Sequence, residues 1–311
     1  MDNQKIGLSL NKFYFLISFL FFSLFLPLSK NSLFALTSMP LPQKDERIMV
    51  VVAHPDDEII GAGGYLSYAI KNKAEVLVVI LTNGEGNRLS ALFNEDQISN
   101  DDLKNIYLRE GETRQNESIK ALNIVGIDQD KIIFLDFPDK YLLNLFRNNW
   151  TKKFTYPYTL MDRPFYLNKY NYDKFYQGED LFKSLDEIFK NFKPNIVITH
   201  NINDYHPDHK ATFLFVSLVL KNNPQLKTEV YTFLVHFNNL YKILNVIPFE
   251  KSDNNEKLEN PNFYFLPLDN SAFLSKKEAL SQYKSQLVSP YLRYIFHSSL
   301  KKDEIFIKEN E

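Results

Sequence analysis

Cysteine is absent from the 311 residues of the sequence. Its absence excludes disulfides, thiolate zinc sites, cysteine nucleophiles and a lipidated cysteine of the lipoprotein type. Any zinc ion bound by this chain would therefore have to be held by histidine and carboxylate side chains.

Positive and negative charges nearly balance, and glycine is scarce. The formal net charge is −2, whereas a nucleic-acid-binding domain usually carries a basic stripe, so we expect no nucleic-acid partner. Only 9 glycines are present, and the cluster at 61–64 lacks the Gly-x-Gly-x-x-Gly spacing of a dinucleotide-binding loop. Carboxylates also stand where a pyrophosphate would bind, which argues against a nucleotide-binding sheet protein.

One long apolar run is present near the N-terminus, from Phe13 to Ser29. Lys5 and Lys12 precede it, a pattern typical of a signal peptide or an N-terminal membrane anchor. A buried core helix is the alternative. We expect an exported or membrane-anchored protein with an extracytoplasmic domain. Because the small residues at 35–37 are only a weak cleavage signal, removal of the segment stays open.

After the apolar run, the pattern predicts a Rossmann-like, doubly wound α/β fold. Continuous apolar runs separated by helical segments are typical of a mainly parallel sheet with both faces covered. The expected strands are 47–53, 75–82, 131–136, 195–200, 229–236 and a short one at 263–268. The expected helices are 58–72, 107–125, 180–192, 206–220 and 275–286, the last with Ser275 as its N-cap.

The expected organisation is a single catalytic domain at 46–300. It follows an N-terminal segment (1–38) and a linker (39–45), and it precedes a polar tail (301–311). Residues 140–178 show no clean period and many aromatics, so they are interpreted as an insertion. The insertion is either packed on the domain surface or an aromatic lid over a sugar site.

The stretch 51–58, Val-Val-Ala-His-Pro-Asp-Asp-Glu, joins the first strand to the first helix. Its charged residues therefore lie at the carboxyl end of a strand, where open α/β sheets bind ligands. Neighbouring carboxylates need a compensating positive charge, and a divalent metal held by His54 and Asp57 is one source. An acidic helix N-terminus without a metal is the alternative.

A second cluster, His206-Pro-Asp-His209, follows the fourth strand. In a parallel sheet it faces the same edge as the first cluster. Two histidines and one aspartate plus water form the open arrangement of hydrolytic zinc sites, and Asp56 is a candidate general base beside them. His200 and His236 end strands at this edge and are weaker candidates for contacts behind the ligands or with substrate, whereas His297 is taken as structural.

Four motifs together resemble the PIG-L (LmbE-like) N-acetylglucosaminyl deacetylases over residues 47–236. They are Ala53-His-Pro-Asp-Asp-Glu58, Thr82-Asn-Gly-Glu85, Arg114-Gln-Asn-Glu117 and His206-Pro-Asp-His209. The resemblance implies His54, Asp57 and His209 as metal ligands. It implies Asp56 as the general base and His206 as the charge-stabilising histidine. Arg114 and Asp139 match the family's substrate contacts.

The resemblance implies a zinc-dependent hydrolase that releases acetate from an N-acetylglucosamine-type glycoconjugate. Zinc is the implied cofactor, and Fe²⁺ is another divalent ion that fits. The apolar N-terminus favours a lipid-linked or envelope glycan as substrate, with membrane association through residues 13–29. An esterase acting on acylated envelope glycan and a non-catalytic carbohydrate-binding envelope protein are the alternatives.

Overall fold

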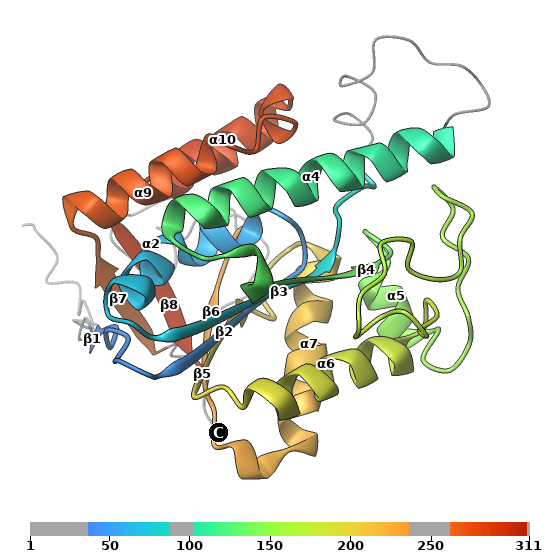
Figure 1. The fold of residues 1–311 in the computed structure, drawn as a ribbon, viewed down its shortest axis with the longest axis horizontal. Coiled ribbons are helices and arrows are strands. Elements are labelled where there is room, and N and C mark those ends of the chain that lie inside the picture. The colour runs from blue at the N-terminus through green and yellow to red at the C-terminus, as the bar shows by residue number, and fades with distance from the viewer. Residues whose placement is uncertain (1–36, 88–102, 237–261, 310–311) are drawn as a thin grey trace, which may run out of the picture.

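The computed structural model describes residues 37–87, 103–236 and 262–309. A central eight-stranded sheet lies between two layers of helices, with α2, α4, α9 and α10 on one face and α5, α6 and α7 on the other (Figure 1). The strands are β1 (Thr37–Ser38), β2 (Arg47–Val52), β3 (Glu75–Thr82), β4 (Ile132–Phe137), β5 (Ile196–His200), β6 (Glu229–Phe233), β7 (Phe263–Pro267) and β8 (Asp303–Lys308). The helices are α2 (Asp57–Lys71), α4 (Leu103–Val125), α5 (Leu142–Arg147), α6 (Gly178–Phe192), α7 (Pro207–Asn222), α9 (Asn270–Leu280) and α10 (Pro290–Ser299).

The sheet order is β1-β7-β8-β6-β5-β2-β3-β4. All neighbouring strands run parallel except β8, which is antiparallel to both β6 and β7. The predicted doubly wound, mainly parallel α/β fold is therefore confirmed.

Buried strands explain why the sequence shows continuous apolar runs instead of alternation. In β2, Ile48, Val50 and Val52 face one hydrophobic core. Met49 and Val51 face the other core, on the opposite side of the sheet. Because successive side chains point to opposite faces and helices cover both, every position of such a strand is apolar.

The sheet reverses its direction of winding between β2 and β5, which are paired neighbours. From β2 the chain proceeds to β3 and β4 on one side, whereas β5 leads to β6 on the other. The loops that leave β2 and β5 therefore diverge and open a crevice at their carboxyl ends, the usual ligand site of such sheets.

The C-terminal part differs from the prediction in several places, and α10 (Pro290–Ser299) is not among the expected helices. The last predicted helix starts earlier, at Asn270, and its N-cap is Asp269, which accepts from the N–H of Ala272 at 2.8 Å; Ser275 lies within the helix. Residues 303–308, expected in a polar tail, instead form β8 and bury Phe306. β8 inserts between β6 and β7, so its stability comes from partners distant in sequence.

The aromatic insertion at 140–178 begins with α5 and continues without further regular structure to α6. Tyr156, Tyr170 and Tyr176 are buried in the same core as Phe137 of β4. These aromatic side chains therefore pack onto the domain, and whether the insertion also covers a ligand site stays a prediction.

The predicted export or membrane anchoring is corrected. Among the described residues, no helix combines the length and apolar character needed to cross a membrane. The run Phe13–Ser29, on which the prediction rested, lies outside the described residues. Thr37–Ser38 pairs with β7, so the sheet includes residues that precede the expected domain start at 46, and the remaining domain division stays a prediction.

Candidate metal and catalytic site

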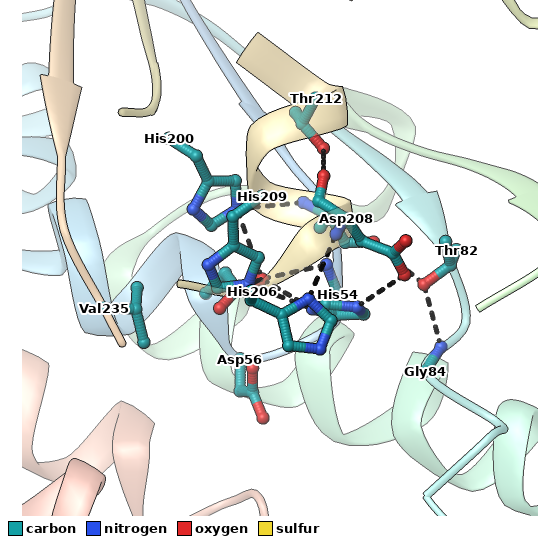
Figure 2. Close-up of polar contacts among 12 residues, drawn as sticks. His54, Asp56, Thr82, Gly84, His200, His206, Asp208, His209, Thr212 and Val235 are labelled. Carbon is teal, nitrogen blue, oxygen red and sulfur yellow. Dashed lines mark hydrogen bonds and ion pairs between the residues drawn. The ribbon is translucent and has the colours of Figure 1, made fainter. Parts of the chain in front are cut away.

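Two loops at the sheet crevice bring the predicted histidines together. His54 lies between β2 and α2, and His206 and His209 belong to the first turn of α7, after β5. Figure 2 shows these three imidazoles gathered at the start of α7, with Asp56 beside them. The ring centroids of His54 and His206 are 4.7 Å apart, and those of His54 and His209 are 5.2 Å apart.

Three ligand atoms form a small triangle at the centre of the site. Nδ1 of His54 is 3.1 Å from Oδ2 of Asp57, Nε2 of His209 is 3.2 Å from the same oxygen, and the two nitrogens are 3.3 Å apart. A tetrahedral ion with ligand bonds of about 2.0–2.2 Å would hold its ligands roughly 3.3–3.6 Å apart. The triangle therefore fits a metal ion after a small expansion.

The other candidate ligand atoms are already engaged. His200, which also approaches Asp57, uses Nε2 to accept from the N–H of Ala53 at 3.1 Å. His206 uses Nδ1 to accept from the N–H of Asp208 at 3.2 Å. The triangle is therefore the best candidate for a cation. Three overlapping groups also lie close enough to hold one: His54 with His206 and His209, Asp57 with His200 and His209, and His54 with Asp139 and Asp208.

Two carboxylates stand behind His54. Its Nε2 is 3.1 Å from Oδ1 of Asp139 and 3.4 Å from Oδ2 of Asp208. Both acids are fixed by the backbone, because Asp139 accepts from Gly86 and Asp208 accepts from Leu142. Metal-bound histidines usually donate their other N–H to a carboxylate, so this arrangement suits Nδ1 of His54 as the ligand atom.

His209 has a carboxylate behind it as well. Its Nδ1 is 3.1 Å from Oδ1 of Asp204, which is fully buried. The contact has ion-pair distance, although its direction departs from that of a hydrogen bond, which leaves Nδ1 without a hydrogen-bond partner. Burial lowers the pKa of His209, but the charges of Asp57 and Asp204 outweigh it and raise the pKa to about 9. The pocket therefore favours positive charge at this ring.

Asp56 lies between the candidate ligands His54 and Asp57 in sequence but is not part of the triangle. Its carboxylate accepts from Arg114 Nη2 at 3.1 Å. Burial, opposed by Arg114 and reinforced by the charge of Asp57, raises the pKa of Asp56 to about 8. The raised pKa of Asp56 thus reflects mainly the burial of its carboxyl group, with the neighbouring Asp57 as a smaller cause.

Arg114 is buried and holds two loops of the site together. It donates to the carbonyls of Gly84 at 2.6 Å and Pro55 at 2.8 Å, as well as to Asp56. Gly84 has φ +65°, and a Cβ there would lie 2.0 Å from the guanidinium, so only glycine allows this approach. Arg114 is thus committed to the protein, although its buried Nε lacks a partner.

His206 is the N-cap of α7, and this role fixes its tautomer. Because Nδ1 accepts the Asp208 N–H, the proton of the neutral ring belongs on Nε2. Burial, together with the charges of His54 and His209, lowers the pKa of His206 to about 2. The ring is therefore a neutral hydrogen-bond donor.

The structure thus brings together His54, Asp56, Asp57, Arg114, Asp139, His206 and His209. His200 stacks on His209 with centroids 3.7 Å apart, and His236 lies 5.1 Å from the same ring. Sequence reasoning missed Asp204 and Asp208 as supports of the histidines. Their closeness to the His-x-x-His motif was a signal, but spacing alone does not show which imidazole each acid faces.

Comparison with known proteins agrees with this geometry. A family model named PIG-L, described as GlcNAc-PI de-N-acetylase, matches residues 49–220, more than half of the chain. The match includes the stretch 51–58 and the His-x-x-His motif at 206–209, and it ends within α7.

Several solved structures share the fold. An N,N'-diacetylchitobiose deacetylase from Pyrococcus horikoshii is 17% identical over 85% of this chain and 84% of its own, with a TM-score of 0.50. The zinc-inhibited form of teicoplanin deacetylase Orf2 is 14% identical over 85% and 99%, with a TM-score of 0.54. GalB, a 4-carboxy-2-hydroxymuconate hydratase from Pseudomonas putida KT2440, is 18% identical over 81% and 83%, with a TM-score of 0.51. Because a hydratase shares the fold, the reaction must be argued from the site.

Proposed function

The chain belongs to the PIG-L family, and from that premise we propose that it removes the acetyl group from an N-acetylglucosamine-type glycoconjugate and releases acetate. Family membership supports a sugar deacetylase. That the enzyme uses a divalent metal and acts on a glycoconjugate is our proposal. The observation that carries it is the triangle of His54, Asp57 and His209, with ligand atoms 3.1–3.3 Å apart and Asp56 beside it.

We propose that the triangle holds a divalent cation, with zinc as the first choice and Fe²⁺ as another ion that fits. When bound, such an ion polarises a carbonyl and lowers the pKa of a coordinated water from about 15.7 towards about 7. Nδ1 of His54, a carboxylate oxygen of Asp57 and Nε2 of His209 would be its protein ligands. Asp139, Asp208 and Asp204 would hold the two rings in the required orientation.

The remaining groups suit amide hydrolysis. Asp56 would take a proton from the attacking water as general base. The new bond joins the water oxygen to the acetyl carbon, and the carbon–nitrogen bond then breaks. Nε2–H of His206 would donate to the oxyanion. The proton held by Asp56 would go to the leaving amine, so acetate and a free amino sugar are the products.

The substrate contacts implied for Arg114 and Asp139 stay a prediction. Both side chains are buried, and their bonds go to protein groups. The preference for a lipid-linked or envelope glycan rested on residues 13–29 and is not retained. We therefore propose an N-acetylated amino sugar as the reacting unit, whatever group is attached to it.

An acetate-release screen tests the proposal. Purified protein is incubated with N-acetylglucosamine conjugates and with O-acetylated sugars, each with and without a chelator. Acetate from the N-acetyl conjugates, abolished by the chelator and restored by zinc, is expected. Acetate from O-acetyl substrates alone would support an esterase instead. Sugar binding without acetate release would support a non-catalytic carbohydrate-binding protein.

A further inference from the structure

The backbone of Asp56 adopts a conformation that an L-residue rarely takes. Its φ is 123° and its ψ is −32°, at the N-cap of α2. Such a conformation persists only where the surrounding contacts impose it, and it occurs preferentially at functional sites. The contacts that impose it here also determine where the Asp56 carboxylate points.

Glu58 supplies one of these contacts. One oxygen of its carboxylate, Oε2, accepts from the N–H of Asp56 at 2.9 Å. The Glu58 side chain is fully buried in the first turn of α2. It is therefore shielded from solvent and turned back towards the preceding backbone.

Two hydroxyl groups from distant parts of the chain hold the other oxygen of Glu58. Oε1 accepts from Oγ of Ser118 in α4 at 2.5 Å and from the hydroxyl of Tyr283, which follows α9, at 2.6 Å. Tyr283 is fully buried and lies outside the residues matched by the family model. Ser118 in α4 and Tyr283 after α9 thus both donate to the Glu58 carboxylate, which also accepts from the Asp56 backbone.

We propose that Glu58 is a positioning residue that fixes the Asp56 carboxylate for proton transfer, and that Tyr283 and Ser118 hold Glu58 in place. The inference deepens the proposed function, because it rests on Asp56 as the general base. Glu58 does not itself act on substrate, since both of its oxygens are engaged within the protein. The segment after α9 therefore completes the site from beyond the family core.

The direct test removes only the Tyr283 hydroxyl. Tyr283→Phe keeps the ring in its packing and leaves Glu58 with one hydroxyl donor. We expect kcat to fall about 10-fold, a part of the ~10²–10⁴-fold contribution of a general base. KM and metal content should stay within about twofold, because the substituted group contacts neither substrate nor the metal triangle.

Tyr65→Phe is the matched control. Tyr65 is also fully buried, in the core that α2 forms with the sheet, but its hydroxyl has no hydrogen-bond partner among the described residues. This variant should keep the kcat of the unmodified protein. An equal fall in both variants would show a general effect of buried hydroxyl loss and would overturn the proposal.

Glu58→Gln and Glu58→Ala separate positioning from folding. Glutamine retains an oxygen that can accept from the Asp56 N–H, so Glu58→Gln should recover most of the kcat lost in Glu58→Ala. If both variants lost kcat equally while remaining folded, the contact with the Asp56 backbone would not be the cause.

A crystal structure of Tyr283→Phe makes the test independent of activity. The Asp56 carboxylate should leave Arg114, its partner at 3.1 Å in the unmodified protein, while His54, Asp57 and His209 stay in place. If Asp56 kept this contact, the proposal would be wrong whatever the activity. Failure of the proposed function would show separately, as absence of acetate release from the unmodified protein.

Discussion

The carboxylate of Asp204 lies 3.1 Å from Nδ1 of His209, on the far side of the ring from the nitrogen that faces Asp57. Asp204 is itself held by backbone N–H groups, from His206 at its Oδ1 and from Val235 at its Oδ2. A carboxylate fixed in this way fixes the plane of the imidazole that it contacts. The orientation of His209, a proposed metal ligand, is thus constrained by Asp204 whether or not a cation is bound.

Asp204→Asn should weaken metal binding about 10–100-fold, because His209 would lose the carboxylate that orients its ring. The dissociation constant for zinc, measured by competition with a chromogenic chelator, checks this outcome. Asp173→Asn is the control, since Asp173 is exposed and pairs only with a neighbouring lysine. Equal zinc affinity in the Asp204 variant and the unmodified protein would remove Asp204 from the metal site.

The closeness of His54 and His209 could be predicted because it depends on the order of the strands. His54 and His209 each follow a buried strand closely, and parallel neighbours place such loops at one edge of the sheet. The pairing of β2 with β5 then brings the two loops together. A local sequence pattern and one topological rule are sufficient for that much of the site.

The supports behind the ligands could not be predicted in the same way. Asp139 follows β4 and lies 3.1 Å from His54, although the two residues are far apart in sequence. Likewise β8 contains only a short apolar run, and its partners β6 and β7 lie far away in sequence. Periodicity within a segment carries no information about such long-range pairing.

Asp56→Asn should retain bound metal and lose turnover by about 10²–10⁴-fold, because the amide cannot accept the proton of the attacking water. Asparagine preserves the shape of the side chain and tolerates positive φ better than most residues. Rates of acetate release and metal content, measured on the same sample, check both halves of the prediction. Turnover at the parent rate would show that Asp56 is not the general base.

Removal of the metal should abolish activity and lower thermal stability together. A cation that binds only the folded protein stabilises it by about 2.7 kcal/mol at 100 times its Kd. Zinc should therefore raise the Tm of the chelator-treated protein and restore acetate release.

The His209→Ala variant should show neither response to zinc, because it lacks one corner of the triangle. His297→Ala is the matched control, since His297 lies exposed on α10 away from the ligands. A zinc-dependent rise of Tm in the His209 variant, equal to that of the control, would place the metal elsewhere.

The buried pair of Lys276 in α9 and Glu304 in β8 should be the main electrostatic contact of the C-terminal segment with the backbone of α2. Nζ of Lys276 lies 2.7 Å from Glu304, whose two oxygens also accept from the N–H groups of Gly64 and Tyr65. Lys276→Met leaves a buried carboxylate without its cation, which should lower the free energy of unfolding by about 3–5 kcal/mol. Urea denaturation measures this change.

An exposed pair between α2 and the residue before α9 provides the comparison. Lys71 in α2 lies 3.2 Å from Asp269 before α9, with both side chains open to solvent. Lys71→Met should change the free energy of unfolding far less than Lys276→Met does, because water already solvates both charges. If the losses in the Lys71 and Lys276 variants were similar, burial would not be what makes the Lys276 pair important, and the C-terminal segment would be held to α2 by apolar packing instead.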